Sequence, residues 1–204
     1  HPYLEAIRQC RGELGKNNAA YVHVTYVPII EMSGEHKTKP TQNSVKELQN
    51  IGIQPDIIVC RSDCPLDAES KGKLALFCNV SSDGIIESVT TDNLYQVPLK
   101  LREQNFAGVA LKKLKMDERE PDLGAWMDMC ARAEKAKKAK KRLRVAVVGK
   151  YTEKVTAYQS LTDALKTAGL LRNAALDISL VACADVEKDI NVLNGFDGIV
   201  IGPG

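Results

Sequence analysis

The chain has 204 residues, of which 44% are hydrophobic and 26% are charged. This balance supports a packed core and excludes a disordered, collagen-like or coiled-coil protein. The formal net charge is only +2, but residues 132–144 alone hold eight Lys or Arg side chains against one Glu. A mildly acidic body therefore carries one strongly basic stretch.

The first 120 residues alternate strand-like and helix-like segments, which indicates a parallel α/β sheet. Short apolar and β-branched runs mark the strands, and apolar residues at helical spacing mark the helices. Ser44 and Glu47 have the spacing of a capping box that begins one helix, Gly52 should end it, and Asp92 should begin another. The strands are predicted at 20–30, 56–60 and 84–89, and the other helices at 3–9, 69–78 and 93–104.

A long helix is predicted at 121–142, and its second half has no apolar stripe besides alanine. We predict a solvated basic linker there. An RNA-binding role stays open, although the stretch lacks interleaved aromatic residues. The alternation then restarts as β-α-β-α-β, the opening of a second doubly wound domain. Its strands are predicted at 143–148, 176–182 and 198–201, and its helices at 158–168, closed by Gly169, and at 186–193.

The ends and the hydropathy pattern suggest where the protein resides. The sequence begins with His1 rather than Met, so we expect a piece of a longer protein. No signal-peptide pattern is present, and no apolar stretch approaches the about 20 residues of a membrane span. We expect a cytoplasmic protein without a membrane or nucleic-acid partner.

The six cysteines lack the spacing of a metal site. Only Cys60 and Cys64 lie close together, and no second Cys or His pair follows at zinc-binding spacing. Several cysteines lie inside apolar runs. We therefore predict buried thiols and no metal site in this chain.

The segment HKTKPTQ at 36–42 is the most informative candidate site. Lys37 and Lys39 can reach one ligand if Pro40 kinks an extended backbone, and the amide of Gln42 can both donate and accept. The following helix would direct its N-terminal dipole at this loop. The segment thus predicts a site for a phosphorylated ligand, with Gln42 reading a polar base edge, although composition alone favours an ordinary exposed loop. Two further hydroxyls come from Thr38 and Thr41.

Other polar residues have simpler explanations. Lys73 could meet a phosphate beside the strand ends, where α/β sheets bind ligands, but it also suits an ordinary helix surface. Glu5 and Arg8 are spaced as an exposed ion pair on one helix. His23 falls in the middle of a predicted strand, which favours packing over catalysis.

Taken together, these segments resemble the CTP synthase family. The resemblance implies part of a P-loop-type amidoligase (synthetase) domain at 1–120, the linker at 121–142, and the opening of a flavodoxin-like class I glutaminase domain at 143–204. The matching strings are YLEAIRQ (3–9), HVTYVP (23–28), the run from KTKPTQ to CRSD (37–63), KLALFCNV (73–80), VAVVGKY (145–151) and AYQSLTDALKTAG (157–169).

The resemblance further implies a ligase of pyrimidine nucleotide synthesis, which aminates UTP to CTP with ATP, Mg²⁺ and ammonia from glutamine. It implies GTP as an activator, CTP as an inhibitor and a homotetramer. The family's catalytic and metal-binding residues match no position here, so the piece alone should be inactive. A nucleotide sensor on the same fold and another glutamine-dependent ligase remain alternatives.

By the same resemblance, particular residues receive roles. The segment matching 37–42 and the lysine matching Lys73 would bind UTP or CTP. The other positions are Glu5 and Arg8 near the CTP pocket at a subunit interface, Val89, Thr90 and Thr91 in the ATP loop, and Gly204 as an oxyanion-hole glycine of the glutaminase.

Overall fold

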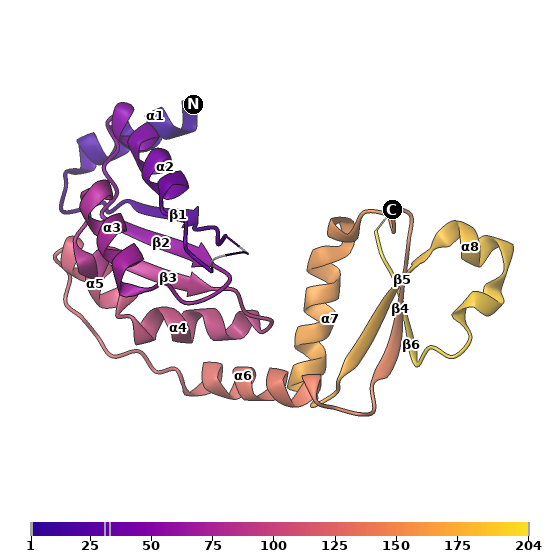
Figure 1. Cartoon of the computed structure of the whole chain (residues 1–204). Helices are drawn as coiled ribbons and strands as arrows, with labels where there is room; N and C mark the ends of the chain where they lie inside the picture. Colours follow the sequence, from indigo (N-terminus) through magenta and orange to yellow (C-terminus); the bar gives the residue numbers. More distant parts are fainter. Residues whose placement is uncertain (1, 31, 33, 204) are drawn as a thin grey trace. The chain divides into compact units, whose positions relative to one another are not determined.

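The computed structural model describes residues 2–30, 32 and 34–203, and the chain divides into two compact units, His1–Pro121 and Asp122–Gly204 (Figure 1). The elements of each unit surround a parallel sheet of their own. Within the described residues, no helix is long and apolar enough to cross a membrane.

The first unit has a three-stranded parallel sheet in the order β1-β2-β3. In register, Val59 of the central strand pairs with Val24 on one side and Ile86 on the other. The three predicted strands are confirmed, although β1 is much shorter than predicted and β2 continues to Ser62, and the helix predicted at 3–9 is part of the longer α1. The elements are α1 (Pro2–Leu14), β1 (Val22–Tyr26), α2 (Lys39–Asn50), β2 (Ile57–Ser62), α3 (Ala68–Cys78), β3 (Ile85–Val89), α4 (Val97–Glu103) and α5 (Phe106–Lys113), with short 3₁₀ turns at η1 (Ser82–Gly84) and η2 (Leu94–Gln96).

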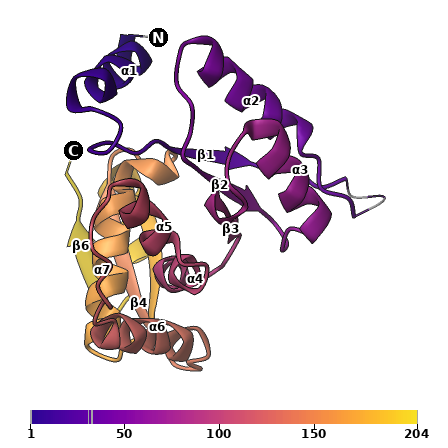
Figure 2. The ribbon, with the colours of Figure 1, turned by 90° about the vertical axis from the view of Figure 1, so that its left-hand side faces the viewer.

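Helices cover both faces of this sheet, which explains the continuous apolar run of β2. Ile58 and Cys60 face a core cluster that includes Val45 of α2 and Leu74 of α3. Ile57 and Val59 face the opposite cluster, to which α5 contributes Val109. Figure 2 shows α2 and α3 on one side of the strands and α4 and α5 on the other.

The capping box predicted at Ser44 is wrong. Helix α2 begins five residues earlier, at Lys39, with Thr38 as its N-cap and Pro40 in the first turn. Proline is favoured there because its fixed φ suits a helix and the first turn needs no N–H donor. Ser44 lies inside the helix, where its hydroxyl lies 3.0 Å from Nε2 of the half-buried His23.

The helix predicted at 93–104 is divided in two. The 3₁₀ turn η2 precedes α4, and the cap is Asn93 rather than Asp92, since the Asn93 side chain accepts a hydrogen bond of 3.2 Å from the N–H of Tyr95. Helix α5 was not predicted. Its apolar residues Phe106, Val109 and Ala110 do have helical spacing and pack in the second core cluster.

The second unit has a parallel sheet in the order β5-β4-β6. The three strands confirm the predicted β-α-β-α-β alternation. Helix α6 is shorter than the helix predicted at 121–142. The elements are α6 (Gly124–Lys137), β4 (Leu143–Gly149), η3 (Val155–Tyr158), α7 (Gln159–Leu171), β5 (Leu176–Ala182), α8 (Cys183–Lys188), η4 (Ile190–Leu193) and β6 (Gly198–Ile201).

Gly169 does not end α7 as predicted. The helix continues to Leu171, and Asn173 adopts the left-handed φ of 55° beyond it. Gly169 is needed for close packing instead, because a Cβ there would lie 2.9 Å from the carbonyl oxygen of Ala174. The helix predicted at 186–193 is likewise interrupted, since the Asp189 side chain caps η4 through a 2.9 Å bond from the N–H of Asn191.

Tyr158 connects two strand ends of the second unit. Its hydroxyl accepts a 2.9 Å bond from the N–H of Lys150, after β4, and donates a 3.2 Å bond to the carbonyl of Pro203, after β6. Gly149 and Gly202 allow the ring this close approach, because a Cβ at either residue would collide with it. The buried ring therefore holds two loops at the carboxyl edge of the sheet.

Tyr158→Phe is expected to destabilise this unit by about 1–2 kcal/mol, because three backbone groups, the N–H groups of Lys150 and Tyr151 and the carbonyl of Pro203, lose their partner. The measurement is hydrogen exchange of the β4 and β6 amides, which should accelerate together. Tyr151→Phe is the matched control, since Tyr151 is exposed, and it should change neither rate. Equal protection in both variants would contradict the role of the Tyr158 hydroxyl.

Candidate functional site

A cavity of about 580 Å³ lies in the first unit, at the carboxyl edge of its sheet. Because the strands are parallel, the loops that follow β1 and β2 meet at this edge. The first loop and the start of α2 form one wall, and one face of α3, from its N-cap Asp67 to Phe77, forms the other. Of the residues predicted to bind a phosphorylated ligand, the lining includes Lys37, Thr38, Lys39, Gln42 and Lys73.

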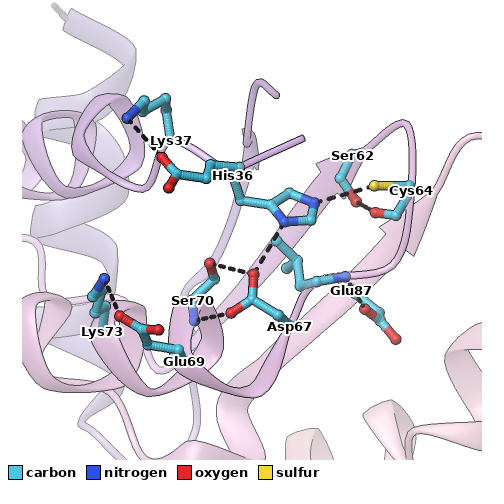
Figure 3. Close-up of polar contacts among 11 residues, drawn as sticks. His36, Lys37, Ser62, Cys64, Asp67, Glu69, Ser70, Lys73 and Glu87 are labelled. Atoms are coloured by element: carbon cyan, nitrogen blue, oxygen red, sulfur yellow. Dashed lines mark hydrogen bonds and ion pairs between the residues drawn. The ribbon is translucent and has the colours of Figure 1, made fainter. Parts of the chain in front are cut away.

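Two of the lysines that line the cavity form ion pairs with glutamate carboxylates (Figure 3). Lys37 Nζ lies 3.5 Å from an oxygen of Glu35, and Lys73 Nζ lies 2.5 Å from an oxygen of Glu69. The hydrogen bond to Glu69 raises the pKa of Lys73. The two glutamate side chains are 69% and 77% exposed, so each ion pair is weak, and a multiply charged anion can replace the carboxylate at little cost.

The N-terminus of α2 adds to the positive potential of the cavity. Thr38, its N-cap residue, makes no capping bond through its side chain. Helix α3 differs, because the Asp67 carboxylate caps it with a 2.7 Å bond from the N–H of Ser70. Of the two helices that line the cavity, α2 therefore presents its N-terminus without a carboxylate cap, a position that favours an anion.

The polar residues of the first helical turn divide into two groups. Gln42 Nε2 donates a 3.1 Å bond to the Thr38 hydroxyl, and both side chains line the cavity. The fully buried Thr41 turns the other way, and its hydroxyl lies 3.2 Å from that of Thr25 on β1. Thr41 thus attaches α2 to the sheet and, like Pro40, does not line the cavity.

The cavity also has lining residues to which the sequence assigned no role, among them His36, Asp67 and Phe77. The ring of Phe77 lies 5.8 Å from Lys39 Nζ, within range of a cation–π contact. A signal was available for Phe77, because it follows Lys73 by four residues on a helix and so shares its face. His36 and Asp67 are brought together only by the fold.

The remaining predicted site residues lie elsewhere. Glu5 and Arg8 form the expected ion pair on α1, with Arg8 Nε 3.0 Å from a carboxylate oxygen of Glu5, and neither lines the cavity. Hydrogen bonding from Arg8 lowers the pKa of Glu5 to about 2. Gly204 lies outside the described residues.

Val89 ends β3, and Thr90 and Thr91 follow it at the same edge of the sheet. The Thr90 hydroxyl donates a 2.8 Å bond to Asp63, and its N–H donates a 2.8 Å bond to the carbonyl of Ser62. Thr90 therefore ties the end of β3 to the loop after β2. None of the three predicted ATP-loop residues lines the cavity.

The cysteines are all free thiols in the structure. Cys60, Cys78 and Cys130 are buried as predicted, but Cys10 is exposed on α1. Among the residues that the structure describes, no group of three or more His, Cys, Asp or Glu side chains is placed to hold a metal ion.

The fold and this cavity define a parallel α/β protein with a lysine-lined pocket at the carboxyl edge of its first sheet. The family model for the CTP synthase N-terminus matches residues 1–116, more than half of the chain. The chain belongs to the CTP synthase family, as the sequence resemblance indicated.

Curated relatives align along nearly the whole chain. The CTP synthase of Carboxydothermus hydrogenoformans is 43% identical over 202 residues, which are 98% of this chain and 37% of that protein. The CTP synthases of Thermococcus gammatolerans and Gloeothece citriformis are 43% and 45% identical over 98% of this chain. The chain thus spans a little over a third of the length of these relatives.

Proposed function

We propose that the protein containing this chain aminates UTP to CTP, and that the lysine-lined cavity binds the nucleotide. Membership in the CTP synthase family supports a role in CTP synthesis. The observation that carries the substrate assignment is the convergence of Lys37, Lys39 and Lys73 on the cavity that Gln42 lines. Three ammonium groups match a triphosphate, and an amide that donates and accepts suits a pyrimidine edge.

In this proposal the chain binds and orients the nucleotide. The lysines take the phosphate oxygens in place of the Glu35 and Glu69 carboxylates. ATP then phosphorylates the uracil O4, and ammonia displaces the phosphate. CTP shares the triphosphate with UTP, so it would compete for the same cavity as an inhibitor. We assign no step to Mg²⁺ on this chain, since the described residues offer no cluster for it.

The second unit would then begin the glutaminase that supplies ammonia from glutamine, with Gly204 as its oxyanion-hole glycine. The parallel β4–β6 sheet is compatible with that assignment. We further propose a homotetramer with GTP as activator, Glu5 and Arg8 near a subunit interface, and Val89, Thr90 and Thr91 beside ATP. The oligomeric state, the activator and these residue roles all rest on the family resemblance.

The test uses the full-length protein. UTP binding is measured by calorimetry in competition with CTP, ATP and GTP, and CTP formation is followed with UTP, ATP, Mg²⁺ and glutamine or ammonia. We expect UTP and CTP to compete for one site and CTP to accumulate. UTP binding without product would indicate a nucleotide sensor instead, and binding without preference for pyrimidine nucleotides would indicate another glutamine-dependent ligase.

A further inference from the structure

A chain of three polar side chains joins the loop after β1 to the loop after β2, and two of the three, His36 and Asp67, line the cavity (Figure 3). The Cys64 sulfur lies 3.5 Å from Nε2 of His36, and Nδ1 of the same ring lies 3.2 Å from a carboxylate oxygen of Asp67. Thiol, imidazole and carboxylate in this order are the arrangement that activates a cysteine, because the ring can accept the thiol proton while the carboxylate orients it.

Neighbouring bonds hold the three groups in place. The Ser62 hydroxyl donates a 2.8 Å bond to the backbone carbonyl of Cys64. The Asp67 carboxylate accepts bonds from the N–H and the hydroxyl of Ser70, at 2.7 and 2.8 Å. The His36 side chain is only 4% exposed, so its ring is fixed between its two partners.

The Asp67 carboxylate orients the His36 ring so that Nε2 faces the Cys64 thiol. Hydrogen bonds from Ser70 and from His36 lower the pKa of Asp67 to about 2, which keeps this carboxylate ionised at neutral pH. An ionised partner draws the ring proton to Nδ1 and leaves Nε2 to accept from sulfur. A metal site is a poorer explanation, since the two ring nitrogens face different partners and cannot bind one ion together.

The other thiols of the first unit provide a contrast. Burial raises the pKa of Cys60 to about 12 and also raises that of Cys78, so both are inert in the folded protein. Cys10 is exposed on α1. Cys64 is partly exposed and has an imidazole as neighbour, which are the two conditions for a reactive cysteine.

We propose that Cys64 is a modification site that forms a mixed disulfide with small-molecule disulfides, with His36 as the base. His36 accepts the Cys64 proton, and the thiolate sulfur attacks one sulfur of the reagent. The reagent's S–S bond breaks as the new bond to Cys64 forms, and the departing thiolate takes the proton from His36. Cys64 is oxidised, half of the reagent is released as a reduced thiol, and a thiol reductant reverses the step.

The adduct would lie next to His36, which also lines the lysine-bearing cavity. The modification itself does not depend on which nucleotide the cavity holds. Its test therefore uses no nucleotide, and a negative result would leave the proposed UTP site untouched.

The test treats the full-length protein with glutathione disulfide at neutral pH and follows each cysteine by peptide mass spectrometry. Cys64 should react at least about tenfold faster than the exposed Cys10, and His36→Asn should remove most of that advantage without changing Cys10. Asp67→Asn keeps a good N-cap residue for α3 but removes the charge. This variant should therefore also lower the reaction rate of Cys64. Dithiothreitol should release the adduct.

Cys60 and Cys78 report folding in the same samples, because they should stay unlabelled in every variant that remains folded. The proposal is overturned if Cys64 reacts no faster than Cys10. It is equally overturned if Cys64 keeps its wild-type rate in His36→Asn while Cys60 and Cys78 remain protected. If His36→Asn exposes those two thiols, the Asp67→Asn variant becomes the test. An unchanged Cys64 rate in that variant rejects the role of the relay formed by Cys64, His36 and Asp67.

Discussion

Lys37→Ala and Lys73→Ala in the full-length protein are each expected to weaken UTP binding about ten- to hundredfold. Each change removes an ammonium group that the structure places at one cavity, from the loop before α2 and from α3. A charge-assisted hydrogen bond to phosphate contributes about 1.5–3 kcal/mol, and that energy sets the size of the effect. CTP affinity should fall in parallel, because the lost contacts are to the shared triphosphate.

Calorimetric titration of UTP at two salt concentrations is the measurement. Lys46→Ala is the matched control, because Lys46 is an exposed lysine on α2 that does not line the cavity. This variant loses the same charge and should keep wild-type affinity. Unchanged UTP binding in both Lys37→Ala and Lys73→Ala would refute the site, whereas equal losses in all three variants would indicate only a long-range charge effect.

The strands could be predicted because their signal is local. The DIIVC run of β2 reads as a strand buried on both faces, and the structure places Ile57 and Ile58 in opposite core clusters. The start of α2 was misplaced because two helix-start signals compete there. Pro40 and a capping-box pattern at Ser44 lie within five residues, and the fold uses Ser44 to contact His23 instead.

The site could be predicted only in part. Lys37, Lys39 and Gln42 stand together in the sequence, so their shared cavity follows from proximity. The relay of His36, Cys64 and Asp67 joins residues 28 and 31 positions apart, and only the parallel pairing of β1 with β2 brings their following loops together. The spacing of these residues in the sequence does not indicate such a contact.

Leu74→Ala is expected to destabilise the first unit by about 2–5 kcal/mol, the cost of an unfilled cavity in a close-packed core. Leu74 is fully buried in the cluster with Ile58 and Val45, on the inner face of α3. The preceding residue, Lys73, lines the cavity from the outer face of the same helix. Leu74 therefore supports the wall that positions a proposed nucleotide contact.

Urea unfolding of the chain, followed by thiol labelling of Cys60, measures this effect. Because Cys60 is fully buried in the same core cluster, its labelling reports the first unit alone, whatever the second unit does. Leu76→Ala is the matched control, since Leu76 lies on the same helix and is 75% exposed, and it should change stability by less than about 0.5 kcal/mol. Equal midpoints for the two variants would show that α3 does not depend on Leu74 for its attachment to β2. A lower urea midpoint for Leu74→Ala alone would show that the packing of Leu74 in the core stabilises the helix that carries Lys73.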